Sequence, residues 1–92
     1  VAAKGPDHPD VGDALSNVGS IRYVMGEYTS AREAYVRSAD ILATELGENH
    51  PRYGTAVANL GNVSLISGDF AEARRYYQQA LAIRPRRFLF DG

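Results

Sequence analysis

The sequence predicts an all-α protein, namely an α-solenoid of two antiparallel helix-turn-helix pairs followed by a C-terminal tail. The first observation is an internal repeat, because the stretch from Gly5 to Pro9 returns, with the same glycine, histidine and proline, from Gly47 to Pro51, 42 positions further along. The second is that apolar residues within each unit recur at i, i+3, i+4 and i+7, the spacing of amphipathic helices. Self-similarity at a fixed period of this size is typical of repeat architectures.

The match between the two units extends through most of their length. It favours a single domain over residues 1–92, or a fragment of a longer array, with a first repeat over 10–46, a second over 52–84 and an apolar, basic tail over 85–92. The paired positions are Gly12 with Gly54, Ala14 with Ala56, Asn17 with Asn59, Gly19 with Gly61, Gly26 with Gly68, Ala31 with Ala73, Arg32 with Arg74, Tyr35 with Tyr77 and Ile41 with Ile83.

The first unit is predicted to contain helices over about 10–25 and 29–46, separated by a tight turn at Gly26. Pro9 suits a first helical turn, and Asp10 places negative charge at the positive end of the helix dipole. Gly19 costs about 1 kcal/mol relative to alanine inside a helix, so we expect a neighbouring helix to approach closely there. The apolar stripe of the first helix is Val11, Ala14, Leu15, Val18, Ile21 and Met25, and the inward stripe of the second is Tyr28, Ala31, Tyr35, Ser38, Ala39, Leu42 and Leu46.

The second unit repeats this plan, with helices over about 52–67 and from near Phe70 to about 83 or 84. The turn between them lies at Gly68, and Pro85 ends the fourth helix because proline disfavours helical geometry in the residue before it. The third helix is expected to present Tyr53, Ala56, Val57, Leu60, Val63 and Ser67, and the fourth Ala73, Tyr77, Ala80 and Leu81.

Composition removes several classes of function. The chain of 92 residues carries a formal net charge of −1, which gives no general attraction to nucleic acid or anionic membranes. It has no cysteine, so disulfide scaffolds and thiolate metal sites are excluded. No apolar run approaches the roughly 20 residues that span a bilayer, and no targeting segment is visible. We therefore expect a cytoplasmic location.

His8 and His50 are the first candidates for metal binding or catalysis, with Asp7 or Asp10 as further ligands. The alternative is that each His-Pro pair belongs to the joint between helix pairs and recurs because the repeat does. Packed helices lie roughly 10 Å apart, too far for two such joints to share a zinc ion with bonds of about 2 Å. Asp10 and Asp13 resemble a carboxylate pair, but acids at a helix start also suit the dipole. We predict no catalytic residue, no metal, no cofactor and no enzyme activity.

These features together resemble the tetratricopeptide repeat, whose motif runs from a large residue through Leu-Gly, a turn glycine, an aromatic, alanine, a second aromatic and alanine to a closing proline. The period of 42 is eight longer than the ordinary 34-residue repeat and is similar to that of kinesin light chains. The first unit supplies Leu15, Val18, Gly19, Gly26, Tyr28, Ala31 and Tyr35, with Ser38 and Ala43 in place of alanine and proline. The second supplies Val57, Leu60, Gly61, Gly68, Phe70, Ala73, Tyr77, Ala80 and Pro85.

The resemblance implies that the first helix of each pair lines a concave binding groove. The implied groove residues are Asp13, Ser16, Asn17, Ser20, Tyr23 and Val24 from one repeat and Thr55, Ala58, Asn59, Asn62, Leu65 and Ile66 from the other. Asn17 and Asn59 are expected to hydrogen-bond a peptide backbone. The four apolar members either hold side chains of the peptide or pack against adjacent helices. One family subset grips a C-terminal carboxylate with a lysine where this chain has Ser16 and Ala58, so that mode is not expected.

The expected function is a protein–protein interaction scaffold that holds an extended peptide or a helix of another protein in this groove. The alternative is self-association, in which Phe88, Leu89 and Phe90 of the tail cap the chain or enter a neighbouring subunit to form a homodimer. Nucleic acid and membranes are not expected as partners. The aromatics that could stack on bases (Tyr28, Tyr35, Phe70, Tyr76 and Tyr77) lie at core spacing, and the basic residues Arg84, Arg86 and Arg87 suit a solvated terminus.

Overall fold

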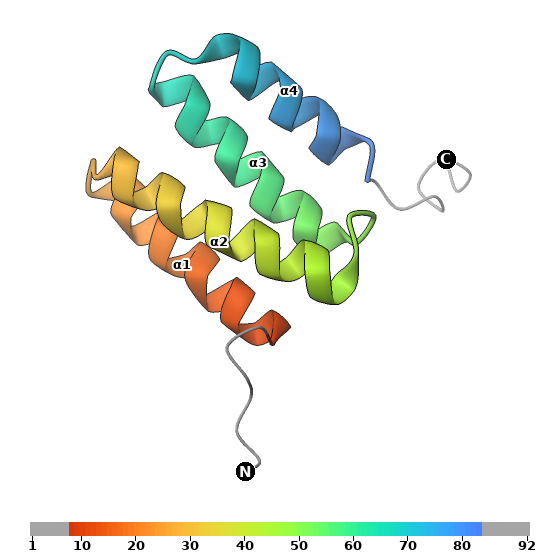
Figure 1. The fold of residues 1–92 in the computed structure, drawn as a ribbon. Helices are drawn as coiled ribbons and strands as arrows, with labels where there is room; N and C mark the ends of the chain where they lie inside the picture. Colours follow the sequence, from red (N-terminus) through yellow and green to blue (C-terminus); the bar gives the residue numbers. More distant parts are fainter. Residues whose placement is uncertain (1–7, 84–92) are drawn as a thin grey trace, which may run out of the picture.

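The computed structural model describes residues 8–83, which form four α-helices joined by short turns. They are α1 (Pro9–Val24), α2 (Tyr28–Leu46), α3 (Pro51–Ile66) and α4 (Phe70–Leu81). Each helix packs against the next in sequence, and α1 also touches α3 (Figure 1). No strand occurs within residues 8–83. The prediction of an all-α helical repeat is confirmed.

The helix ends lie within about one residue of the expected positions, except for the end of α4. His8 and His50 are N-cap residues, because their Nδ1 atoms accept hydrogen bonds from the backbone N–H groups of Asp10 at 3.0 Å and Arg52 at 3.1 Å. The proline after each histidine is the first residue of the helix, where its missing N–H costs nothing. Helix α4 ends at Leu81, before the expected 83 or 84, and the Ile83 N–H bonds to the Ala80 carbonyl in a tightened last turn.

The close approach predicted at the repeated glycine exists, and an aromatic ring makes it. A Cβ on Gly19 would lie 2.7 Å from the ring of Tyr35 on α2, and one on Gly61 would lie 2.7 Å from the ring of Tyr77 on α4. In each helix pair the second helix therefore lays a tyrosine flat against the glycine of the first. The helix propensity lost at these glycines is exchanged for ring packing.

The hydrophobic core lies between α2 and α3. Its cluster of buried side chains is Ala31, Tyr35, Ala39 and Leu42 from α2 with Ala56, Leu60 and Val63 from α3. The outer helices contribute little, since the buried residues of α1 are only Gly12 and Gly19 and that of α4 is only Ala73. Within residues 8–83 the two middle helices thus form the interior, and α1 and α4 are the outer helices (Figure 1).

Part of the predicted apolar stripe of α1 is therefore not in the core. Val18, Ile21 and Met25 are exposed, because no helix of residues 8–83 lies on that side of α1. Tyr28 and Leu81, both predicted to point inward, are also exposed. The ring of Tyr28 packs edge-on against that of Tyr23 at a centroid distance of 5.4 Å. The 3.6-residue period located the apolar faces, but a face is buried only where a neighbouring element covers it.

Candidate binding surface

The predicted groove residues lie on α1 and α3, the first helices of the two pairs, and most of them are open to solvent. Asn17, Ser20, Val24, Thr55, Asn62, Leu65 and Ile66 are exposed, whereas Asp13, Ser16, Tyr23, Ala58 and Asn59 are partly buried. None of the twelve is a fully buried core residue. A surface along α1 and α3 is thus available for contact with another molecule.

A pocket of about 210 Å³ lies where α1 and α3 face each other. Its walls are Asp13, Ser16 and Asn17 from α1 with Arg52 and Thr55 from α3. Four of these five residues belong to the predicted groove, and Arg52 does not. The structure therefore brings together the N-terminal part of the predicted surface, with one arginine that the sequence reasoning missed.

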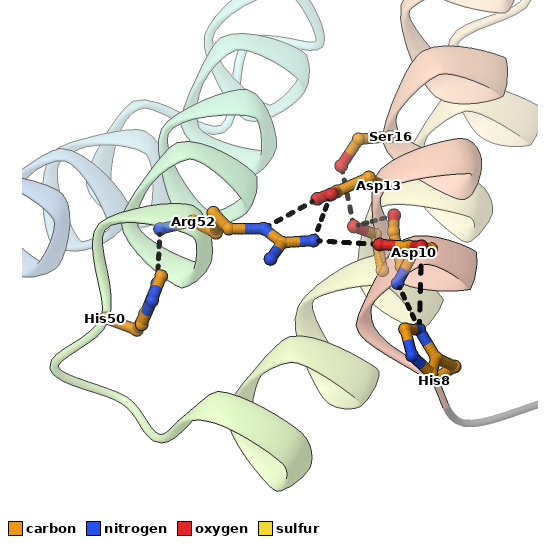
Figure 2. Close-up of polar contacts among 8 residues, drawn as sticks. His8, Asp10, Asp13, Ser16, His50 and Arg52 are labelled. Atoms are coloured by element: carbon orange, nitrogen blue, oxygen red, sulfur yellow. Dashed lines mark hydrogen bonds and ion pairs between the residues drawn. The ribbon is translucent and has the colours of Figure 1, made fainter.

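Arg52 lines this pocket and reaches from α3 toward Asp13 and Asp10 on α1 (Figure 2). Its guanidinium donates two hydrogen bonds to the Asp13 carboxylate, one of them from Nε to Oδ1 at 3.4 Å, and its Nη2 lies 3.7 Å from Oδ1 of Asp10. The hydrogen bond with Asp13 and the charges of both aspartates raise the pKa of Arg52 above its ordinary value. A signal was present in the sequence, because the repeat shift aligns Arg52 with Asp10, a charge of the opposite sign.

Ser16 is held by a polar contact inside the first helix pair. The Ser38 hydroxyl donates its proton to the Gly12 carbonyl at 2.7 Å, so across the 2.6 Å contact between the two serines it is Ser16 that donates to Ser38. Ser38 is fully buried, and this chain of bonds satisfies it. Ser16 therefore presents only the acceptor side of its oxygen to the pocket.

The C-terminal end of the predicted groove is apolar and open. Val24 is 85% exposed, Leu65 is 49% exposed and Ile66 is 51% exposed. Tyr23 differs, since it is partly buried, packs against the core and contacts Tyr28. Three of the four apolar positions are thus free for a ligand. Tyr23 both packs against the core and forms part of the surface, so its replacement would disturb the packing in addition to any ligand contact.

The asparagines of the surface differ in how firmly they are held. The Tyr77 hydroxyl donates a hydrogen bond to Oδ1 of Asn62, which fixes that side chain across the second helix pair. The side chains of Asn17 and Asn59 make no hydrogen bond to another residue within the described part of the chain. Their amides can therefore turn to meet a peptide backbone, each offering one acceptor and two N–H donors.

The two histidines do not belong to this surface, because both cap helices. His8 and His50 use Nδ1 to cap α1 and α3, and within residues 8–83 no group of three or more acidic, histidine or cysteine side chains is placed to hold a metal ion. Phe88, Leu89 and Phe90, like Arg84, Arg86 and Arg87, lie outside the described residues. No helix in the described range is long and apolar enough to cross a membrane.

Stacked helix pairs with an open surface along their first helices define a helical-repeat protein. The sequence model of the tetratricopeptide repeat matches residues 10–86, and the chain belongs to that family. No curated protein matches the chain. Tetratricopeptide repeats are in general protein–protein interaction modules with a non-catalytic fold.

Proposed function

We propose that this chain is an interaction module that binds a peptide or a helix of another protein along α1 and α3. The observation that carries the proposal is the pocket between these helices, lined by four residues of the expected groove. It lies at one end of a surface whose other end carries three exposed aliphatic side chains. Polar anchoring at one end and apolar contact at the other is the usual composition of a peptide site.

The charges of the pocket favour a ligand that is anchored by hydrogen bonds. The guanidinium of Arg52 is neutralised by Asp13 and Asp10, so it attracts a free carboxylate only weakly. Asn17 and Thr55 are exposed beside it and can bond to backbone groups of an extended peptide. Val24, Leu65 and Ile66 then give the apolar contacts on which affinity depends.

The proposal is tested by selecting ligands from a random peptide library displayed on phage and measuring their affinities by fluorescence polarisation. Asn17→Ala and Ile66→Asp, both at exposed positions, should weaken the selected peptides about tenfold or more while circular dichroism shows an intact fold. Ile21→Asp, an equally exposed position on another face of α1, is the matched control and should change nothing. Peptides that respond to Ile21→Asp and ignore both groove variants would contradict the proposal.

Self-association through residues 86–92 is the second candidate. It is favoured by exposed apolar side chains on α4, where Phe70 and Leu81 have no covering neighbour within residues 8–83. Removal of residues 86–92 should then lower the melting temperature or abolish a dimer. Light scattering and thermal melts of the full chain and the shortened one decide it. An unchanged mass together with an unchanged melting temperature would exclude this candidate.

A further inference from the structure

The outer face of α1 consists of Ala14, Val18, Ile21 and Arg22. Its three apolar members are exposed, and Ile21 has 61% of its surface open to solvent. This face is separate from the groove, whose α1 residues are Asp13, Ser16, Asn17, Ser20, Tyr23 and Val24. An apolar stripe this open, on a helix this regular, is a candidate contact surface.

The second repeat shows which kind of element can pack against a face of this composition. One period along, the equivalent positions on α3 are Ala56, Leu60, Val63 and Ser64, and all four are buried. Helix α3 packs against α4 as α1 packs against α2. The difference between the two faces comes from α2, which also packs against α3. Ala31, Tyr35, Ala39 and Leu42 of α2 form one buried cluster with Ala56, Leu60 and Val63 of α3. The ligand shape that fits the outer face of α1 is therefore an amphipathic helix with a stripe of this kind.

The polar contacts at the end of the α2–α3 interface indicate which charge a helix bound to α1 should carry. On α3 the guanidinium of Arg32 from α2 lies over three acceptors: Glu72 at 2.9 Å, Asp69 at 3.4 Å and the Ser64 hydroxyl at 3.5 Å. The equivalent residues of the first repeat are Ser30, Glu27 and Arg22. A guanidinium thus replaces the buried serine, and a hydroxyl replaces the glutamate that Arg32 binds most closely. An arginine at this place would meet Arg22.

Arg22 is available for an ionic partner. Its guanidinium donates to the Ser30 hydroxyl at 2.6 Å, and within residues 8–83 no carboxylate lies within ion-pairing distance of it. Glu27, the N-cap residue of α2, forms no ion pair with Arg22 within residues 8–83. A carboxylate from an approaching helix completes the ion pair that this end of α1 lacks.

A second copy of the chain does not meet these requirements. The helix equivalent to α2 is α4, and it carries Arg74 where α2 carries Arg32. Stacked in the same register, Arg74 of one copy would lie against Arg22 of the next. Like charges at an interface oppose association, so this face selects against the chain's own α4.

We propose that the outer face of α1 binds an amphipathic helix of another sequence, one with the apolar spacing of α2 and an aspartate or glutamate at the place of Arg32. This site does not depend on the groove.

The probe is a synthetic peptide of the α2 sequence, Tyr28–Leu46, carrying Arg32→Glu and held helical by a lactam bridge on its solvent side. The matched probe has the native Arg32. Both are titrated into the full chain and followed by fluorescence anisotropy. The glutamate probe should bind saturably and about fivefold more tightly than the arginine probe, the size measured for partly exposed charge pairs. Arg22→Glu in the protein should reverse this order.

Two protein variants locate the bound probe. Ile21→Asp should weaken binding at least tenfold, and Ile66→Asp, in the groove, should leave it unchanged. Loss of binding in Ile66→Asp alone would place the probe in the groove and overturn the proposal. A probe that displaces α2 would respond to Glu72→Gln and ignore Ile21→Asp, which also overturns it.

Three further results would overturn the assignment of the partner. They are the absence of saturable binding by either probe, equal binding of both probes, and concentration-dependent self-association of the native chain that Ile21→Asp abolishes. The last would identify the occupant as a second copy. Sedimentation of the native chain and of this variant provides that measurement.

Discussion

Val63 on α3 and Ile21 on α1 occupy equivalent positions in the two repeats, yet Val63 is fully buried and Ile21 is 61% exposed. Both are aliphatic, both lie in a helix that starts with His-Pro, and both helices contact the second helix of their own pair. Within residues 8–83, α2 packs against α3 on the side of Val63, whereas no helix covers α1 on the side of Ile21. The comparison teaches that in this architecture the repeat determines which side chains form a face, and the neighbour determines whether that face is core or contact surface.

The largest expected effect comes from equivalent aliphatic residues on the two first helices. Leu60→Ala should destabilise the chain by about 3 kcal/mol, because it leaves a cavity in the α2–α3 core. Val18→Ala, its counterpart on α1, should cost less than about 1 kcal/mol, because Val18 is already exposed. Urea unfolding followed by circular dichroism measures both. Similar losses of unfolding free energy in the two variants would show that Val18 is covered in solution. The proposed difference between the outer helix α1 and the inner helix α3 would then be wrong.

Equivalent glycines give effects of opposite sign. A Cβ on Gly12 would lie 2.9 Å from Cγ of the buried Leu42, so Gly12→Ala should destabilise by roughly 1 kcal/mol after its gain in helix propensity. A Cβ on Gly54 would meet Ile83 at 3.5 Å, an ordinary contact, so Gly54→Ala should stabilise by up to about 1 kcal/mol. Thermal melts of the two single variants check the signs. A stabilised Gly12→Ala would mean that Leu42 can shift away without cost.

The smallest effect is a pH dependence that arises at Glu72 in the second repeat. Hydrogen bonds from Ser64 and Arg32 hold the pKa of Glu72 below its ordinary value of 4.5. The stability that this carboxylate contributes is therefore present above about pH 4.5 and is lost as the pH falls through the lowered pKa of the folded state. Its side chain is 33% exposed, and solvent screening keeps the effect small. Glu72→Gln should flatten this part of the stability–pH curve, whereas Ser30→Ala, at the equivalent place in the first repeat, should leave it unchanged. An identical slope in native chain and Glu72→Gln would assign the acid loss to other carboxylates.

The four helices, their turns and the joint between the pairs could be predicted from sequence, because they depend on local chemistry. Gly26, Gly47 and Gly68 adopt φ of 83°, 94° and 86°, values that side-chain-bearing residues rarely take. The histidine of each His-Pro pair caps a helix, and this role accounts for the recurrence of the pair. The helical period also indicated which residues of α1 share a face.

The contacts between repeats could not be predicted in the same way, because they depend on how far one helix pair is displaced from the next. The Arg52–Asp13 pair joins residues that no local pattern connects, although the alignment of Arg52 with Asp10 held a hint. The contact of Arg32 with Ser64 and Glu72 is of the same kind. Tyr23 showed the opposite error, since its position on the surface of α1 concealed its contact with Tyr28 and the core.

The Arg52 bridge also makes the two units unequal building blocks. Arg52 of the second unit reaches back to Asp13 and Asp10 of the first, and Asp10 is its own equivalent one period earlier. A tandem copy of the first unit would bring aspartate toward aspartate at this junction, and a tandem copy of the second would bring Arg52 toward Arg52. Only an array in which the first and second units alternate brings aspartate and arginine together at the junction. The charges at the junction therefore favour one order of the units. In concatemers with the units in other orders, junctions that bring like charges together should be less stable than junctions that pair arginine with aspartate.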